Sequence, residues 1–463
     1  MRFFVANRLA RSKPASHLAL AIALVTGTAV SMVAVAEPAH AQKKKKKKDK
    51  KDEAKPEYSE EFIAAYQPIQ EILNAEGGDA SAAVGLVPGM LALAKSPDEQ
   101  LVAGNSIYNV GVKSNERPLQ LQGMKLMLAS GKVDADQVGR YNFVVYQLSN
   151  AAGDYPTART YLQRAIDANF TTETVTRSGL QIAMSESFFS EGNIEGGLDY
   201  LSQAIAQRKA SGQPVEESWY RRGLSVSYNN QIMPDVYEFV AGWISDFPSQ
   251  DNWRDAINIS RNLGSLSSPE MLDLMRLGYR IDTFNGKQEY IDYVDAADPR
   301  RLPKEVEKVI ENGYATGRAS RDDIFLSDSL ATAKGRIAAD RSDLPALERD
   351  AGSSTAALRT VVAAGDAFLS YDQPEKAARF YSRSLNLPGV DTAQVQTRLG
   401  IAQFDMGDFA AASETFEQVS GNRKSIAQLW AAYAREKAVP AAPVVPAVPT
   451  PATPADAVAA PTS

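Results

Sequence analysis

The residue types that most often perform covalent chemistry are nearly absent from this chain of 463 residues. It contains two histidines, His17 and His40, and no cysteine. Both histidines precede Gln42, the first residue after a candidate cleavage site. From Gln42 onwards the chain can form neither a Ser-His-Asp nor a Cys-His nucleophile pair, and it lacks the usual nitrogen and sulfur ligands of zinc. Any metal ion would have to be held by oxygen atoms alone, and we expect neither a metal nor a cofactor.

Short catalytic motifs are also absent from residues 42–463. This part of the chain contains no phosphate-binding glycine loop, no G-x-S-x-G nucleophile elbow, no S-x-x-K and no H-E-x-x-H. The carboxylate pairs of glycosidases have no local motif, because geometry alone defines them. A search for such carboxylates has to start from glutamates on predicted helices.

Two Glu-Ser pairs, Glu186-Ser187 and Glu217-Ser218, are the candidates for that chemistry. Muramidases of the lytic transglycosylase type combine a helical superhelix with a catalytic Glu-Ser pair. Neither pair here is followed by the Gly-Leu-Met-Gln segment of that family. We therefore expect both glutamates to solvate helix faces and the protein not to be an enzyme. A muramidase-like helical enzyme of the cell wall is one alternative.

The first 41 residues have the pattern of a secretory signal peptide. Basic residues precede an apolar stretch over residues 18–36, which is followed by Pro38 and by the small-residue site Ala39-His40-Ala41. We expect cleavage before Gln42 and export to the periplasm. An uncleaved anchor is the alternative, since the apolar stretch approaches the length that spans a bilayer.

Residues 42–57 form a lysine-rich segment, which we expect to be a disordered tether. Nine lysines cannot fold around a core, and they could bind an anionic lipid or polysaccharide surface. Eight of them are assigned to that surface: Lys43, Lys44, Lys45, Lys46, Lys47, Lys48, Lys50 and Lys51, with Lys55 close by. Positive charge directly after an apolar stretch also opposes translocation, so a reversed anchor with a cytoplasmic body is a further alternative.

The rest of the chain is acidic. Without residues 1–55 it has 37 basic and 52 acidic residues, a net charge of −15. Such a body repels nucleic acid, which we do not expect as a partner.

Residues 59–437 show amphipathic helical segments of about 12 to 18 residues, separated by short breaks of Gly, Asn, Asp or Pro, with little period-two alternation. This pattern predicts an all-α protein built from αα-hairpins. Residues 438–463 change to Ala, Val and Pro, with prolines at three-residue spacing, and predict an extended, disordered tail.

A repeat is visible in the last third of the chain. Three residues recur after 35 positions: Gly365, Ala377 and Tyr381 return as Gly400, Ala412 and Phe416. Small residues at the first two positions let two antiparallel helices approach closely, and the aromatic residue fills the adjacent space. The segment 358–425 resembles the tetratricopeptide repeat (TPR) family. We expect residues 353–437 to form a TPR pair with a capping helix.

Degenerate copies of the same pattern lie upstream. Gly153-Asp154-Tyr155 and Gly192-Asn193-Ile194 are turn phrases 39 residues apart, each followed by small and apolar residues at helical spacing. The segment from Trp219 to Gly223 matches the start of a further unit. Residues 58–248 are therefore predicted to be TPR-like hairpins. Residues 249–352 look helical but fit no register, and we interpret them as a divergent segment and a possible hinge.

The resemblance implies a solenoid whose concave groove, lined by the first helix of each hairpin, binds a protein or peptide. In the register of Trp219 and Gly400, the groove residues would be Glu186, Phe189, Tyr220, Leu224, Tyr228, Gln394, Arg398 and Ile401. Phe189 and Leu224 could equally be core residues. The predicted function is a non-catalytic protein-protein interaction scaffold of the bacterial envelope, with electrostatic tethering through the lysines as a second alternative.

Overall fold

The computed structural model describes residues 58–75, 79–263 and 266–439. The expected signal peptide, the lysine-rich segment with Lys43 to Lys51 and nearly all of the expected proline-rich tail lie outside these residues. Within them the protein is all-α, with 21 α-helices and one 3₁₀-helix. No helix in this described part has the length and apolar character needed to cross a bilayer.

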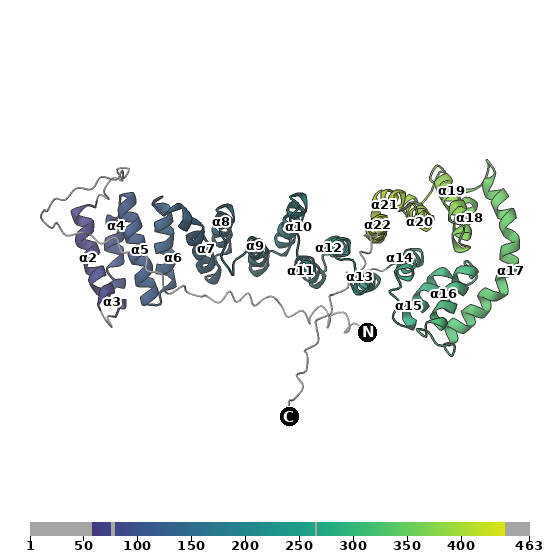
Figure 1. Cartoon of the computed structure of the whole chain (residues 1–463), viewed down its shortest axis with the longest axis horizontal. Coiled ribbons are helices and arrows are strands. Elements are labelled where there is room, and N and C mark those ends of the chain that lie inside the picture. The colour runs from purple at the N-terminus through teal and green to yellow at the C-terminus, as the bar shows by residue number, and fades with distance from the viewer. Residues whose placement is uncertain (1–57, 76–78, 264–265, 440–463) are drawn as a thin grey trace, which may run out of the picture. The chain divides into compact units, whose positions relative to one another are not determined.

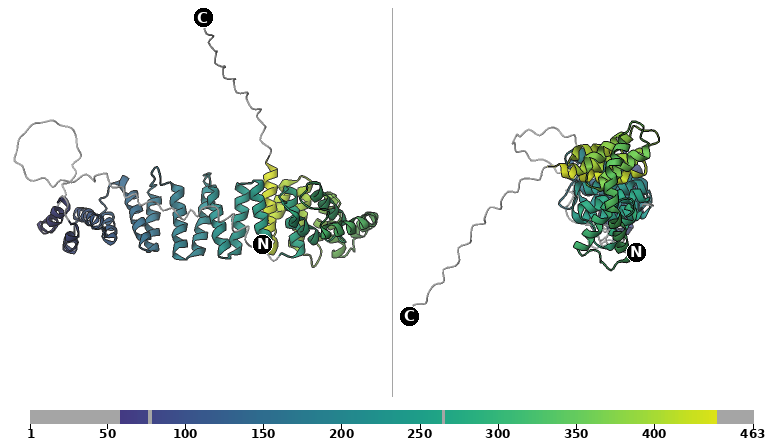
Figure 2. Two further views of the ribbon diagram at one scale, coloured as in Figure 1. Left: turned by 90° about the horizontal axis from the view of Figure 1, so that it is seen from below. Right: turned by 90° about the vertical axis from the view of Figure 1, so that its right-hand side faces the viewer.

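The chain divides into two compact units, residues 1–239 (unit 1) and 240–463 (unit 2). The described helices of unit 1 lie side by side in chain order (Figures 1 and 2). They are α2 (Glu60–Asn74), α3 (Ser81–Val84), α4 (Val87–Leu93), α5 (Pro97–Lys113), α6 (Arg117–Ala129), α7 (Ala135–Ala151), α8 (Tyr155–Asp167), α9 (Arg177–Glu191), α10 (Ile194–Ala210), α11 (Glu217–Asn229) and the first half of α12 (Met233–Asp246).

The described part of unit 2 holds the rest of α12 and the helices that follow it. They are α13 (Gln250–Leu263), α14 (Ser268–Ile281), α15 (Lys287–Ala297), α16 (Pro303–Ala315), α17 (Ile324–Gly352), α18 (Leu358–Ser370), α19 (Pro374–Ser384), α20 (Thr392–Asp405), α21 (Phe409–Glu417), the 3₁₀-helix η2 (Gly421–Arg423) and α22 (Lys424–Ala438).

The predicted turn phrases form the hairpins of unit 1. Gly192 ends α9 with a φ of 87°, a left-handed conformation that residues with a Cβ rarely adopt. Asn193 then caps α10, because its side chain accepts a hydrogen bond from the main-chain N–H of Gly196. Asp154 caps α8 in the same way, through Thr157. The hairpins α7–α8 and α9–α10 are therefore confirmed.

The segment predicted to hold the C-terminal repeats contains the hairpins α18–α19 and α20–α21, followed by α22. A Cβ added to Gly400 would lie 2.6 Å from the ring of Phe416, so the two helices touch at this glycine. Gly365 and Tyr381 make the equivalent contact. The spacing of 16 residues occurs again in unit 1, where Gly223, predicted from the sequence, packs against Phe239, which the sequence pattern did not predict as its partner.

Residues 249–352 belong to the same compact unit as the C-terminal hairpins. α14 packs against both α20 and α22, and α17 connects α16 to α18 (Figure 1). The described helices of unit 2 thus follow a closed circuit in which α14 meets α22, the last described helix. The circuit buries faces of α14 and α20 that an open solenoid would leave exposed.

The same substitution at two helix-interior glycines tests this packing. Gly400→Ala should lower the free energy of unfolding by about 1–3 kcal/mol, because the added methyl group overlaps Phe416. Gly335→Ala, in α17, should raise it by about 0.5–1 kcal/mol, since beyond its own stretch of helix backbone the added Cβ meets open space and alanine favours the helix. Urea unfolding of both variants measures the difference. Equal shifts would contradict the register of the α20–α21 hairpin.

Candidate functional site

The predicted groove residues of α9 are joined to the next hairpin. Both carboxylate oxygens of Glu186 accept hydrogen bonds from Arg222 of α11, at 2.6 and 2.7 Å. The guanidinium group of Arg222 also lies 5.3 Å from the ring centroid of Phe189. Phe189 also packs against Gly197, where an added Cβ would lie 2.3 Å from the ring. Glu186 and Phe189 are half-buried and connect neighbouring hairpins.

The prediction that Tyr220 and Leu224 line an exposed groove is wrong. Their side chains are buried, with exposures of 2% and 0%. α11 is the first helix of its hairpin and packs against α10 on one side. Its buried arc also includes Trp219 and Gly223, so the exposed strip of the helix is narrower than the sequence register implies. Tyr228, one turn after Leu224, is partly exposed.

Arg398 and Ile401 are also not groove residues, since both are buried. The face of α20 that an open solenoid would present is covered by α14. Arg398 donates hydrogen bonds to Asp366 of α18 at 2.7 and 2.8 Å and to Asp273 of α14 at 3.4 Å. Gln394 is partly exposed on the same helix and accepts a hydrogen bond from Arg423 at 3.4 Å.

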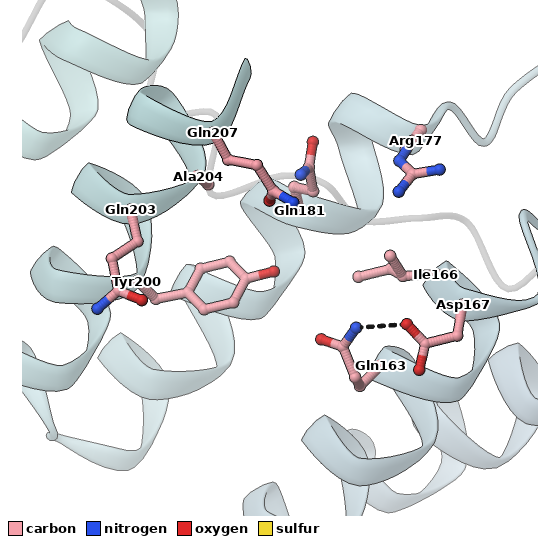
Figure 3. A pocket seen from close by; sticks show the side chains of 9 residues that line it. All are labelled: Gln163, Ile166, Asp167, Arg177, Gln181, Tyr200, Gln203, Ala204 and Gln207. Carbon is pink, nitrogen blue, oxygen red and sulfur yellow. Dashed lines mark hydrogen bonds between the residues drawn. The ribbon is translucent and has the colours of Figure 1, made fainter. Parts of the chain in front are cut away.

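A different surface of unit 1 is hollowed. The hollow has a volume of about 210 Å³ and lies between α8, α9 and α10 (Figure 3). Four of its nine lining residues are glutamines, and we call it the amide hollow. It is lined by Gln163, Ile166, Asp167, Arg177, Gln181, Tyr200, Gln203, Ala204 and Gln207.

Several lining side chains of the amide hollow are held in place. Gln163 donates a hydrogen bond to Asp167 at 2.8 Å, along α8. Gln181 is buried and accepts one from Arg208 at 3.2 Å. Arg208 is fixed in turn by the main-chain carbonyl of Pro214, at 2.9 and 2.7 Å. Lining side chains of α8 and α9 are therefore held in place.

Tyr200 presents its hydroxyl group to the amide hollow (Figure 3). Its ring packs against Phe188, with ring centroids 6.4 Å apart. Burial and the nearby carboxylate of Asp167 raise the pKa of Tyr200, while Arg177 opposes the increase. The hydroxyl group thus remains protonated at neutral pH and can donate a hydrogen bond.

The amide hollow could not be predicted from the repeat register, because that register predicts binding on the first helix of each hairpin. Most of the lining residues belong to α8 and α10, the second helices of their hairpins. The sequence does contain a sign of this hollow. Gln203 and Gln207 lie one helical turn apart on a helix whose core is already formed by apolar residues at helical spacing, so the two glutamines share a face outside the core.

Unit 2 contains a larger cavity of about 510 Å³ with charged walls. Arg280 of α14 binds Asp405 of α20 through two hydrogen bonds, at 2.8 and 2.6 Å. Lys308 of α16 lies 2.7 Å from Asp372, in the turn after α18. These ion pairs join the residues that line the cavity, so its charges are largely matched within the protein. No group of three or more acidic or histidine side chains in the described ranges is arranged to hold a metal ion.

No family model and no curated protein matches this chain. The chain is similar to a solved structure described as "Structure of Naa15/Naa10 bound to HypK-THB". The TM-score is 0.27 and the sequence identity 14%, over 81% of this chain and 60% of that chain. This chain thus spans less than two thirds of the length of that protein.

Proposed function

We propose that this protein is a non-catalytic scaffold that binds a protein partner through unit 1. The amide hollow is the observation that supports this proposal most directly. It lies between successive hairpins, two of its glutamines are held by hydrogen bonds, and its polar side chains can both donate and accept hydrogen bonds. Helical repeat arrays use the side chains of successive helices in this way to present binding surfaces.

The chemistry of the available side chains supports a non-catalytic role. From Gln42 onwards the sequence has no histidine or cysteine. The two glutamates considered for glycosidase chemistry both bind arginines: Glu186 binds Arg222, and Glu217 binds Arg221. Neither glutamate lines the amide hollow or the cavity of unit 2. No feature of the described residues favours the muramidase alternative.

The proposed location is the bacterial envelope, supported by the basic, apolar and small-residue pattern of residues 1–41. The partner would then be another envelope protein. The lysines after Gln42 could add a reversible attachment to an anionic surface, as in the tether alternative.

Site-specific photo-crosslinking in cells of the source organism tests this function. A benzophenone amino acid replaces Gln203 in the hollow or, as a control, Gln67, an exposed glutamine on α2 of the same unit. We expect a protein partner to be captured at position 203 and not at position 67. Capture of the same proteins at both positions, or of none at either, would contradict the proposal.

A further inference from the structure

We propose that the amide hollow recognises the main chain of an extended peptide segment of the partner, largely independently of its side chains. This inference rests on the proposed function of unit 1 and specifies what its binding site contacts. Three features lead to it: the hydrogen-bonding capacity of the glutamines, their spacing, and the size and charge of the hollow.

The glutamines match the hydrogen-bonding groups of a peptide. Each peptide residue other than proline offers one N–H donor and one C=O acceptor. A glutamine side chain offers an acceptor oxygen and two N–H donors, so a single side chain can bind both groups of one residue. The side-chain amides of Gln203 and Gln207 form no hydrogen bond with other described residues and are exposed. Gln181 uses its oxygen for Arg208 and still has its N–H groups to donate.

The spacing of the glutamines fits an extended chain. Gln203 and Gln207 are four residues apart on α10, about 6 Å along the helix axis. In an extended peptide, alternate residues point their N–H and C=O groups to the same edge, about 6.6 Å apart. Two glutamines one turn apart can therefore bind alternate residues of one segment. Gln163 and Asp167 have the same spacing on α8, on the opposite side of the hollow (Figure 3).

The charge and size of the hollow also suit an uncharged main chain. Its charged lining residues are one acid, Asp167, and one base, Arg177. A volume of about 210 Å³ is below the range of about 300–1,000 Å³ that typically holds a small-molecule ligand. It suffices for a short stretch of main chain.

A sugar would need similar hydrogen bonds, but it would also need an open aromatic face to stack on. The aromatic residue in the lining, Tyr200, packs its ring against Phe188 and turns its hydroxyl edge to the hollow. The arrangement therefore favours a peptide over a carbohydrate.

The test begins with a phage-displayed library of random decapeptides selected against the mature chain, residues 42–463. The peptide that is enriched most is synthesised, and each of its main-chain nitrogens is methylated in turn. We expect methylation to weaken binding about tenfold at alternate residues and little at the residues between them. Replacing its side chains with alanine should have a smaller effect.

Variants of the protein provide the matched control. Gln207→Ala should weaken binding of the enriched peptide about tenfold, whereas Gln67→Ala should leave it unchanged. Both positions are exposed, so neither change should alter the melting temperature.

The outcomes separate this inference from the proposed function. If peptides bind but methylation shows no alternation, main-chain recognition is wrong while the scaffold function stands. The same holds if no peptide binds and the crosslinker at Gln203 still captures a protein. If chitohexaose binds to the hollow and competes with the enriched peptide, the hollow is a carbohydrate site and the inference is overturned.

Discussion

Asp273→Asn should lower the free energy of unfolding of unit 2 by about 3–5 kcal/mol, the effect expected when one partner of a buried ion pair is removed. Asp273 of α14 has no exposed surface. Its carboxylate oxygens lie 3.1 Å from Arg276, 3.4 Å from Arg398 and 2.5 Å from Arg423. Asparagine preserves the shape of the side chain but leaves these guanidinium groups without one of their counter-charges.

The neighbouring side chains cannot replace the lost charge, because they are already matched. Arg276 also binds Glu305 through two hydrogen bonds of 2.7 Å, and Arg398 binds Asp366. Three carboxylates thus face three guanidinium groups in one network. Arg423 depends most on Asp273, since its other hydrogen bond within the described residues is one of 3.4 Å to the amide oxygen of Gln394. The network joins α14 to α16, α18, α20 and η2.

Tryptophan fluorescence during urea unfolding measures this effect. Three of the four tryptophans, Trp243, Trp253 and Trp430, belong to unit 2, so the signal mainly reports on that unit. Glu311→Gln is the control, because Glu311 makes partly exposed ion pairs with Lys334 and Arg321. This substitution should lower the free energy of unfolding by less than about 1 kcal/mol. If the two variants unfold at the same urea concentration, the buried network does not stabilise unit 2.

The hairpins could be predicted from the sequence because their determinants are local. A turn glycine, a capping residue three positions before its N–H partner, and a glycine 16 residues before an aromatic residue all lie within one hairpin. The circuit of unit 2 has no such signature. It depends on contacts such as Asp273 with Arg398, 125 residues apart, and Trp430 with the main chain of Asp273, 157 residues apart.

The prediction of groove residues failed for the same reason, because burial by distant helices is not visible in the sequence. The register of Gly400 predicts that Arg398 faces an exposed groove, but the side chain is buried among carboxylates. The reverse happened at the amide hollow, where Gln203 and Gln207 look like ordinary surface residues of a helix. Only the placement of α8 and α9 beside them shows that they line a hollow.

The free energy of unfolding of unit 2 should also depend on pH, through the protonation of Glu305. Burial alone would raise the pKa of this carboxyl group, but the charge and hydrogen bonds of Arg276 and the hydrogen bond from Tyr293 outweigh burial and lower the pKa from 4.5 to about 2. The unfolded chain therefore binds a proton at a higher pH than the folded chain does. The resulting stabilisation is fully present above about pH 4.5 and is lost as the pH falls through about 2.

This difference in pKa corresponds to about 3 kcal/mol in total, with about 2 kcal/mol lost between pH 5 and pH 3. Urea unfolding followed by tryptophan fluorescence at a series of pH values measures it.

Glu305→Gln should be less stable than the unsubstituted protein at pH 6, since Arg276 loses a buried partner, but its stability should fall less steeply as the pH is lowered. Other carboxylates, such as Asp273, are present in both proteins. The gap between the two curves, which is the difference in free energy of unfolding between the two proteins at each pH, therefore reports on Glu305. We expect that gap to narrow by about 2 kcal/mol between pH 5 and pH 3. A gap of constant width would show that Glu305 does not lose a charge-dependent interaction on protonation, and that Arg276 is stabilised mainly by Asp273.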